Sequence, residues 1–414
     1  MDQKKFCAVP WNELYITSNG TYGLCCMEDQ NINQQRIPLT KEIDQHWNSD
    51  YMRSVRKSFI KGEQLPQCRH CWKDENAGKI SGRLRRNQQY YGQGEILIED
   101  NVIKETLKNT DIQGNSQEPI KGLFFSVGNL CQLRCIDCSP SYSRSILKDY
   151  EKLGWDANTK NRRLIMQQDM LHNEKQHNEM LWKRVKESGS KIEWIRVQGG
   201  EPTISRPLLE FLKWYNDLGH AKHTTIFIIT NSVNIKQEFI DALKPFRQVK
   251  FEISVDGYHE LDEYLRYPTN WEKKEKIIDT LLKEFPGGVI HSTIYSLNLG
   301  GLPELIKWAE TKPAMHSIQC LTYPDELAIQ HLPEDYKLQI IEQLSPWIVE
   351  NAYKVENNYD PQKYRNNCIN GVVNRLKQKG DVEQWKKAKE IIRSYNTIRP
   401  NKLENLIPGL SKYI

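Results

Sequence analysis

Short apolar runs alternate along the chain with longer stretches in which apolar residues recur every three or four positions. Six runs of strand length predict β-strands at Gly122–Val127, Glu193–Gln198, Thr225–Thr230, Val249–Val255, Val289–Tyr295 and Ser317–Thr322. Helical periodicity predicts helices near 142–188, 206–219, 235–244, 271–284 and 302–311. Because strand and helix alternate and the strands are mostly continuous apolar runs, we expect a parallel sheet covered by helices. Six such units predict an α/β fold, a partial (β/α)6 barrel of the TIM type, with active groups at the carboxyl ends of its strands.

The residues on either side of this predicted barrel have different patterns. Residues 1–95 combine short strand-like pieces, a hairpin signal at Asn19-Gly20 and the helical stretch "IDQHWNSDYMRSVRKSFIKG", so we expect a small, cysteine-rich α+β domain. Residues 96–118 are polar and rich in turn formers, which predicts a connector. We therefore place the barrel at 119–325 and a polar, helical C-terminal region at 326–414.

The composition is that of a soluble globular protein. Of the 414 residues, 38% are apolar and 27% are charged. The mean hydropathy is −0.70, and no apolar run approaches the ~18 residues that a membrane span requires. The first residues, "MDQKKFCAVPWNELY", lack the apolar core of a signal peptide, so we expect a cytoplasmic protein without a membrane partner. The net charge of +5 is mild and does not by itself indicate a nucleic-acid partner.

The ten cysteines are concentrated in the first third of the chain, and eight of them precede residue 140. In a reducing compartment such clustering indicates metal ligation or redox chemistry. Cys131, Cys135 and Cys138 follow the first predicted barrel strand in "FFSVGNLCQLRCIDCSPSYS". Thiolates are the usual ligands of iron–sulfur clusters, and three of them leave one iron of a four-iron cubane free. The alternatives are a zinc site with a distant fourth ligand, or buried thiols; the spacing favours the cluster, because zinc sites favour paired Cys-x2-Cys units.

The spacing Cys-x3-Cys-x2-Cys after the first strand of a partial barrel resembles that of the radical S-adenosylmethionine (radical SAM) enzymes. The resemblance implies a [4Fe–4S] cluster on the three cysteines, with S-adenosylmethionine (SAM) chelating the open iron. In that family an electron from the cluster cleaves SAM to methionine and a 5′-deoxyadenosyl radical, which abstracts a hydrogen atom from the substrate. One departure is Asp137, because the position before the last cysteine is commonly aromatic or apolar in the family.

Other predicted strand ends carry residues that the same resemblance assigns to SAM binding. "WIRVQGGEPTIS" matches the family's GGEP motif, and "ISVDG" resembles its Ser-x-Asp-Gly strand. An arginine in "LDEYLRYP" stands where relatives often bind the SAM carboxylate, and an asparagine after "HSTIYSL" resembles one on the adenine side. The residues that we expect to contact SAM are Gly199, Gly200, Glu201, Pro202, Asn231, Ser254, Asp256, Arg266 and Asn298. Taken alone, Gly199-Gly200 and Asp256-Gly257 read as ordinary turns, and Arg266 as a solvated helix residue.

The N-terminal cysteines resemble an auxiliary-cluster module. The pattern Cys-x12-Gly-x4-Cys, followed by Cys-x2-Cys, is similar to the module called SPASM or to its shorter single-cluster form, twitch. In most relatives the module follows the barrel, whereas here it precedes it. The resemblance implies a second, auxiliary cluster of the [4Fe–4S] type, with the ligands Cys7, Cys25, Cys68 and Cys71. Cys26 could replace Cys25, and a zinc ribbon built from two cysteine pairs is the alternative for the whole block.

Two further features have less specific patterns. Cys320 ends the sixth predicted strand and could face the pocket, although a packed core thiol is the stronger interpretation of this residue and of Cys368. The stretch "SGRLRRNQQYYGQG" is basic and aromatic, which is compatible with binding a nucleic acid or an acidic peptide. A solvated helix face is the interpretation that we favour for it, so a nucleic-acid partner is not excluded.

We therefore predict a radical SAM enzyme with two clusters that abstracts a hydrogen atom from its substrate. Relatives with the auxiliary module mostly modify peptides or proteins, which implies a peptide or protein substrate and an electron donor such as flavodoxin or ferredoxin. The alternatives are modification of a nucleotide, sugar or other small metabolite, and a non-catalytic iron–sulfur or zinc protein. The GGEP and "ISVDG" elements argue against the last alternative, because a scaffold has no use for a SAM pocket.

Overall fold

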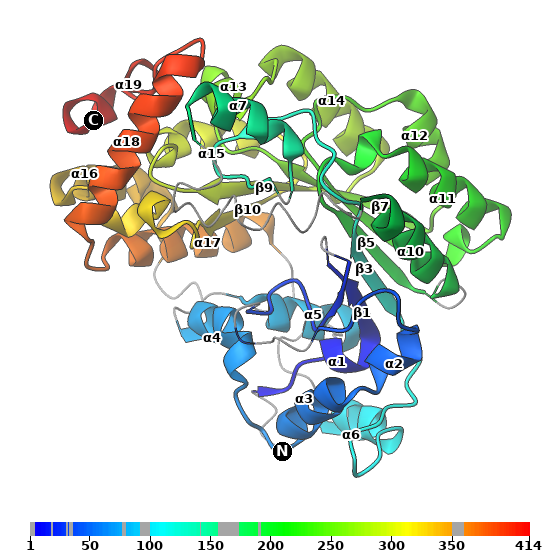
Figure 1. The fold of residues 1–414 in the computed structure, drawn as a ribbon. Coiled ribbons are helices and arrows are strands. Elements are labelled where there is room, and N and C mark those ends of the chain that lie inside the picture. The colour runs from blue at the N-terminus through cyan, green and yellow to red at the C-terminus, as the bar shows by residue number, and fades with distance from the viewer. Residues whose placement is uncertain are drawn as a thin grey trace.

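A computed structural model describes the chain except for residues 1–4, 18–19, 30–31, 33–35, 77–79, 92–99, 141, 156–173, 189–191 and 350–359. Its centre is an eight-stranded sheet with the strand order β10-β9-β7-β6-β5-β3-β1-β2 (Figure 1). The strands are β1 (Glu13–Ile16), β2 (Tyr22–Gly23), β3 (Gly122–Ser126), β5 (Trp194–Gln198), β6 (Thr225–Thr230), β7 (Gln248–Ser254), β9 (Val289–Ile294) and β10 (Met315–Cys320). All neighbouring pairs are parallel except β1 with β2. In the part of the chain described here, the sheet stays open, with β10 and β2 as its outer strands.

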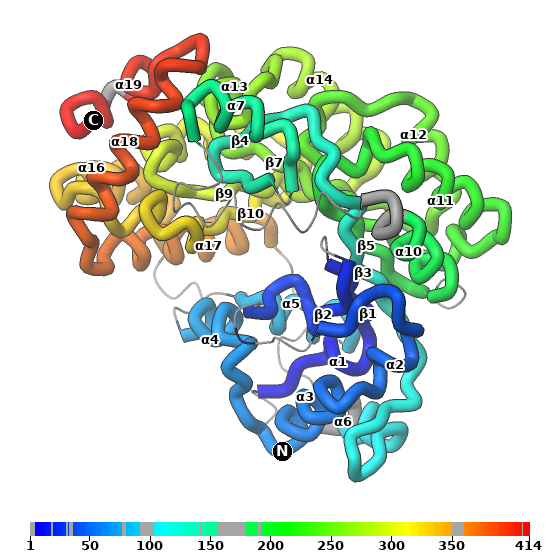
Figure 2. Tube along the Cα trace, viewed as in Figure 1, coloured from blue at the N-terminus to red at the C-terminus, as the bar shows by residue number. Residues whose placement is uncertain are grey.

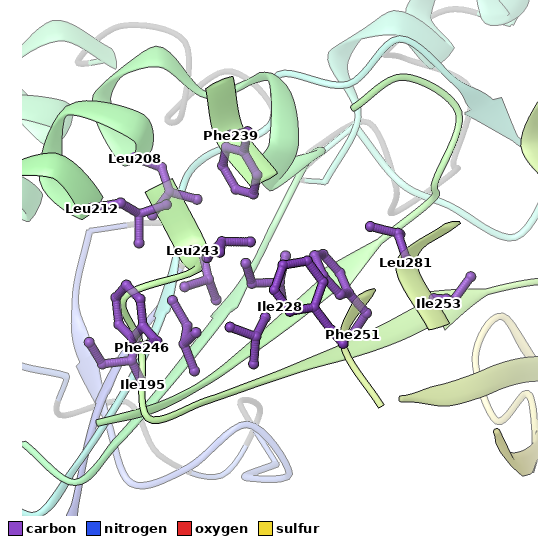
Figure 3. Close-up of a cluster of buried hydrophobic side chains, with 14 of the residues drawn as sticks. Ile195, Leu208, Leu212, Ile228, Phe239, Leu243, Phe246, Phe251, Ile253 and Leu281 are labelled. Atoms are coloured by element: carbon purple, nitrogen blue, oxygen red, sulfur yellow. The ribbon is translucent and has the colours of Figure 1, made fainter. Parts of the chain in front are cut away.

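One face of the sheet is covered by helices that follow the strands. They are α10 (Glu174–Glu187), α11 (Arg206–Asp217), α12 (Gln237–Leu243), α14 (Trp271–Glu284) and α15 (Leu302–Glu310). Alternate strand residues such as Ile195, Ile228 and Phe251 point to this side and pack against helix residues such as Leu212 and Phe239 (Figure 3). Full burial of each such side chain contributes about 1.5–3 kcal/mol, so this packing determines which residues face the helices and which face away.

The N-terminal cysteine-rich unit is joined to the barrel through the sheet itself. β1 pairs in parallel with β3, so the first strand of the chain extends the barrel sheet by one position. Figure 2 shows the chain leaving the sheet after β1 and β2, passing through the N-terminal helices and returning at β3. These helices lie on the side of the sheet opposite α11, α12 and α14 (Figure 1). The helices between β2 and β3 are α2 (Ile43–Trp47), α3 (Asp50–Ile60), α4 (Arg69–Asn76), α5 (Gly82–Tyr91) and α6 (Asp100–Lys108), and α1 (Val9–Asn12) precedes β1.

The C-terminal region is a second helical layer beyond the last strand. It contains α16 (Glu334–Leu344), α17 (Pro361–Leu376), α18 (Val382–Ile398) and α19 (Leu403–Leu406). Its apolar residues form a separate core with the loops that follow β7 and β9, including Tyr264, Leu297 and Ile392. The helix α17 packs along β10, the outer strand on this side (Figure 1).

The predicted barrel strands are confirmed with small shifts at their ends. The largest shift is at the sixth strand, which begins at Met315, two residues before the predicted start. The predicted helix at 142–188 is observed as α7 (Leu147–Lys152) and α10, and the residues 156–173 between them lie outside the described part. The hairpin signal is matched by the antiparallel pair β1 and β2, although Asn19 itself is not among the described residues. The polar stretch at 96–118 was expected to be a connector and instead contains α6, because its apolar positions have helical spacing and Ile103 is buried.

Candidate functional site

The loop after β3 brings Cys131, Cys135 and Cys138 together at the carboxyl end of the sheet. The first two thiols are buried and the third is half-buried, and all three pack in one apolar cluster with Leu133. The backbone N–H of Leu133 donates to Cys131 Sγ over 3.4 Å. Burial, together with the smaller effects of the Asp137 and Cys131 charges, raises the pKa of Cys138 to about 12. A metal cluster that binds here therefore has to displace thiol protons.

A second, two-stranded sheet holds this loop in place. β4 (Arg134–Cys135) pairs antiparallel with β8 (Arg266–Tyr267), which sets Cys135 opposite Arg266. Arg266 Nη1 donates to Asp256 Oδ2 over 2.5 Å, and both side chains are largely buried. Burial disfavours the Arg266 charge, but the neighbouring Cys135 and Asp256 outweigh it and hold the Arg266 pKa well above its usual range. The loop thus has a permanent cation beside its thiols.

The turn after β5 approaches the cysteine loop so closely that it requires glycine. Gly199 has φ +89° and Gly200 has φ +41°. A Cβ atom on Gly199 would lie 1.9 Å from Ser126 Oγ, and one on Gly200 would lie 2.2 Å from Leu130 O. The next residue, Glu201, donates its backbone N–H to Leu130 O over 2.8 Å. Glycine at both positions therefore lets the two loops meet backbone to backbone.

The Glu201 carboxylate connects the end of β5 to the end of β6. Its Oε1 accepts hydrogen bonds from the Thr203 backbone N–H and hydroxyl and from the Thr230 hydroxyl, and its Oε2 accepts one from the Asn231 N–H over 2.7 Å. Glu201 is 1% exposed, and this burial raises its pKa. Pro202 then begins a single 3-10 turn that the Glu201 side chain caps. Among the described residues, Oε1 accepts three hydrogen bonds and Oε2 accepts one, so Oε2 is the freer of the two oxygens.

Asn231 connects the predicted SAM residues to the cysteine loop. Its Nδ2 donates to Cys131 Sγ over 3.6 Å, and its Oδ1 accepts from Gln132 Nε2 over 3.3 Å. Asp256, at the end of β7, accepts from the Thr293 N–H over 2.8 Å in addition to its ion pair with Arg266. Ser254, two residues earlier, is half-buried on the same strand.

Asn298 occupies a different environment from the other predicted SAM residues. It is 1% exposed, and its Nδ2 donates to the carbonyls of Asp256 and Thr293 while its Oδ1 accepts from the Tyr295 N–H. Each of these bonds measures 2.8 Å. In this structure Asn298 therefore supports the loop that carries Asp256, rather than pointing to an open space.

The five N-terminal cysteines line one cavity of about 670 Å³, which lies on the face of the sheet opposite α11, α12 and α14. Cys7, Cys25 and Cys68 share one apolar cluster. Burial raises the pKa of Cys25 well above its usual range, and the charges of Cys26, Cys71, Cys68 and Cys7 add to this rise. Cys26 differs in being exposed, and the charged side chains that act on it most strongly are Arg86 and Glu13. Within the described residues, no three metal-ligating side chains converge closely enough to hold a single ion.

The opposite wall of this cavity is formed by side chains of the barrel strands. The inward-facing residues are Phe124, Arg196, Gln198, Phe227, Ile229, Lys250, Glu252, Val289, His291, Met315, Ser317 and Gln319. Gln198 directly precedes Gly199, and His291 pairs with Ser254 across β7 and β9, so the cavity ends beside the predicted SAM residues. We did not predict any of these wall residues as functional. The sequence pattern that could have identified them is the alternation within "FIIT" and "VKFEIS", where every second residue faces away from the helices.

A second cavity of about 840 Å³ lies between α4, β10 and α17. It is lined by charged residues of both signs, among them Lys73, Asp74 and Arg375, and also by Cys320 and Cys368. Both cavities are lined by Met27, Arg85, Ser317, Gln319 and Tyr364, so they share a wall.

The basic helix α5 is not the solvated face that we expected. Arg83 is 4% exposed and forms an ion pair with Glu75 over 2.6 Å. Arg86 forms an ion pair with Glu13 over 2.9 Å, and both residues line the first cavity. The helix lies on the side of the sheet opposite α11, α12 and α14, so its arginines point toward the cavity rather than into the solvent. The prediction of a solvated helix face was wrong, because the sequence pattern does not show which part of the molecule packs against this helix.

Several buried polar atoms near the cysteine loop have no hydrogen-bond partner among the described residues. They are Ser126 Oγ, Gln132 Oε1 and Arg266 Nε. Unpartnered buried polar groups are rare in folded proteins and commonly indicate a site for a bound group. Three thiols, a fixed cation and these atoms together fit an iron–sulfur cluster with a polar ligand beside it.

Comparison with known proteins identifies the two parts of the chain. Residues 125–309 match the Radical SAM superfamily, and residues 7–72 match the SPASM iron–sulfur cluster-binding domain. No curated protein sequence matches the chain. The chain thus carries a radical SAM domain preceded by a SPASM domain, as the cysteine patterns predicted, and it is a radical SAM enzyme whose cofactors are [4Fe–4S] clusters and SAM.

Similar solved structures include two of SuiB from Streptococcus suis. The structure bound to S-adenosylmethionine has 14% identity and a TM-score of 0.35, and the one bound to the precursor peptide SuiA has 15% identity and a TM-score of 0.36. Each similarity covers 81% of this chain and 68% of SuiB. TYW1 with a lysine-pyruvate adduct has 17% identity and a TM-score of 0.30, over 65% of this chain and 82% of TYW1.

Proposed function

Because residues 125–309 form a radical SAM domain with a SPASM domain before it, we propose that this enzyme abstracts a hydrogen atom from a peptide or protein and thereby modifies it. The observation that carries the proposal is the pair of adjoining cavities. One ends beside the predicted SAM residues and is lined by the N-terminal cysteines, and the other continues past β10 between α4 and α17. Either volume alone would hold a small molecule. Two cavities with a common wall instead suit an extended chain.

In this proposal Cys131, Cys135 and Cys138 hold the cluster that binds SAM. When bound, the reduced cluster and SAM supply a carbon-centred radical that removes a hydrogen atom from the substrate. Cys7, Cys25, Cys68 and Cys71 would hold the auxiliary cluster in the wall of the substrate cavity. A small electron-transfer protein such as flavodoxin or ferredoxin would deliver the electrons.

The other proposed SAM residues position the cofactor and exclude water. Gly199 and Gly200 shape a turn that presses against the cysteine loop, which leaves no room for solvent between them. Glu201 Oε2 is available to accept from the SAM ammonium group, because its partner Asn231 occupies only one of its positions. Arg266 is already ion-paired with Asp256, so this pair would present both a cation and a carboxylate to the polar groups of SAM.

The experiment is a turnover assay under anaerobic conditions. The reconstituted enzyme, incubated with SAM and dithionite, should release 5′-deoxyadenosine, and the Cys131→Ala/Cys135→Ala/Cys138→Ala variant should release none above background. Candidate peptides should then be added, and their masses compared with and without the enzyme. Release of 5′-deoxyadenosine by the triple variant at the same rate would refute the assigned site. Modification only of small metabolites, with every peptide unchanged, would refute the proposed substrate class.

A further inference from the structure

A row of alternating aromatic and cationic side chains crosses the wall of the first cavity. Phe124, Arg196, Phe227 and Lys250 lie opposite one another on the adjacent strands β3, β5, β6 and β7. All four side chains line the cavity. The Arg196 guanidinium lies 5.8 Å from the Phe124 ring centroid and 4.7 Å from that of Phe227. The Lys250 ammonium lies 5.8 Å from the Phe227 centroid on the other side. Such contacts partly stabilise a cation, because the face of an aromatic ring carries partial negative charge.

The two cations of this row differ in one respect. Arg196 also has a carboxylate partner, since its Nη1 lies 2.7 Å from Glu252 Oε1. Lys250 is half-buried, and among the described residues no carboxylate lies within ion-pair distance of its Nζ atom. Burial lowers the pKa of Lys250, and repulsion by Arg196 lowers it further, against a smaller opposing effect of Glu252. A desolvated cation without a counter-ion destabilises the fold unless something else balances its charge.

Apart from its cysteines, the side chains that line the cavity carry more positive than negative charge. Five cationic side chains line it, against two carboxylates, Glu13 and Glu252. Glu13 is ion-paired with Arg86, and Glu252 with Arg196, so neither is available to Lys250. A carboxylate of a bound molecule would supply the ion-pair partner that Lys250 lacks among the described side chains.

We propose that Lys250 binds a carboxylate group of the substrate, so that the modified peptide carries an acidic residue or its C-terminal carboxylate inside the cavity. This inference rests on the proposed function, because it takes the cavity as the substrate site. Phe227 would cover one side of the ion pair and exclude water from it, which strengthens the charge–charge interaction. Arg196, held by Glu252, would set the position of Phe227 without competing for the substrate.

The position of Lys250 also predicts the spacing within the substrate. Lys250 precedes Ser254, at the predicted SAM end of β7, by four residues on one strand. At about 3.3 Å per residue this is roughly 13 Å along the strand. An extended peptide that runs parallel to β7 would cover that distance in about four residues. The acidic group should therefore lie about four residues along the peptide from the residue that reacts.

The test measures carboxylate binding at Lys250 without any turnover. The lysines of the anaerobically reconstituted enzyme are dimethylated with ¹³C, and the Lys250 methyl signal is assigned by its loss in Lys250→Arg. N-acetyl-glutamate N-methylamide should shift this signal to saturation. Its glutamine counterpart should bind about tenfold more weakly or not at all, as expected for the loss of one charge-assisted contact. The signal of Lys244, an exposed lysine paired with Asp241, serves as the matched control and should not saturate.

Two outcomes would overturn the proposal. One is a Lys250 signal that responds equally to the glutamate and glutamine compounds. The other is a response to inorganic phosphate that is stronger than the response to the carboxylate, which would assign the site to a phosphate-bearing substrate instead of a peptide acid. Lys250→Met should melt no lower than wild type, because it removes the unpaired charge, and it should lose glutamate protection against thermal unfolding. Because no SAM or reductant is present, failure here is distinguishable from failure of the proposed radical chemistry.

Discussion

The two cysteine sites differ in how the chain brings their ligands together. Cys131, Cys135 and Cys138 belong to one loop that follows β3, whereas the N-terminal cysteines come from three segments spread over residues 7–71. In the loop, spacing alone restricts the thiols to one neighbourhood. At the N-terminal site, the thiols meet only because β1, α4 and α5 pack around the cavity. A local site can therefore be recognised from its spacing, whereas a dispersed site depends on the whole unit being folded.

The surroundings of the two sites also differ. The loop lies beside a cation, Arg266, and its Cys131 sulfur accepts hydrogen bonds from Leu133 and Asn231. The N-terminal thiols Cys7, Cys25 and Cys68 also lie in an apolar cluster, and in addition they line the cavity. Hydrogen bonds to a cysteine sulfur and a fixed cation beside it suit a site that also binds an external polar molecule. We therefore propose SAM at the first site and the auxiliary cluster at the second.

The largest expected effect comes from removing the loop ligands. Reconstituted wild-type enzyme should contain about eight irons per chain, because each cubane holds four, and the Cys131→Ala/Cys135→Ala/Cys138→Ala variant about four. The variant should also lose all SAM cleavage. Iron and acid-labile sulfide analysis gives the count. A variant that loses all eight irons would contradict the independence of the two sites, and zinc in wild type would contradict a cluster.

The neighbouring pair Cys25 and Cys26 offers a matched test of the second site. Cys25 shares its surroundings with Cys7, Cys68 and Cys71, whereas Cys26 is exposed and faces Arg86 and Glu13. We expect Cys25→Ala to reduce the iron content to about four per chain and Cys26→Ala to leave it near eight. The two variants differ by one position and remove the same group, so each is the control for the other. The reverse result would make Cys26 the ligand.

A smaller effect is expected from Glu201→Gln. The Thr230 hydroxyl and the Asn231 N–H donate to the Glu201 carboxylate, and the amide of the variant would place an NH₂ group among these donors. Charge-assisted hydrogen bonds worth about 1.5–3 kcal/mol are therefore weakened. We expect SAM affinity to fall about tenfold to a hundredfold while the iron content stays the same. Equilibrium dialysis with labelled SAM measures this. Glu210→Gln, in the exposed ion pair with Arg206, is the control. An unchanged SAM affinity would show that Glu201 only joins the strands β5 and β6.

The fold class and the cysteine loop could be predicted because their signals are local. The six barrel strands are short runs that are continuously apolar or alternate apolar with polar residues, and the triplet spacing lies within one loop. The lining of the cavity could not be predicted, because Arg196, Lys250 and His291 come from three strands whose order and facing are properties of the sheet. The same reason explains the basic helix α5, whose Arg83 and Arg86 are paired with acids distant from them in sequence or on another element. Patterns along the chain give the direction of a side chain, but not the surface that it meets.

The smallest predicted effect is a dependence of stability on pH, with one histidine in each region. Burial lowers the pKa of His46, which stacks on Tyr22 in the N-terminal unit, to about 3, and does the same for His316 in β10. In the unfolded chain both have a pKa of about 6.5. Below about pH 6.5 the unfolded state therefore binds more protons than the folded state, and the free energy of unfolding falls as the pH falls.

The stabilisation from each histidine should be complete above about pH 6.5 and should be lost below it, at about 1.4 kcal/mol per pH unit, down to a pH of about 3. His46→Phe keeps the ring stack and should remove the contribution of one histidine to the slope in anaerobic denaturant unfolding, and His316→Phe should remove a similar contribution. Burial also lowers the pKa of His291, so part of the slope should remain when both are replaced. His223→Phe, at an exposed position, should remove none. Because β1 belongs to the barrel sheet through its pairing with β3, we expect the two regions to unfold in one transition, so each substitution should act on the same curve. If each histidine instead changes a separate transition, the N-terminal unit and the barrel are independently stable, and the shared sheet does not couple the two cysteine sites.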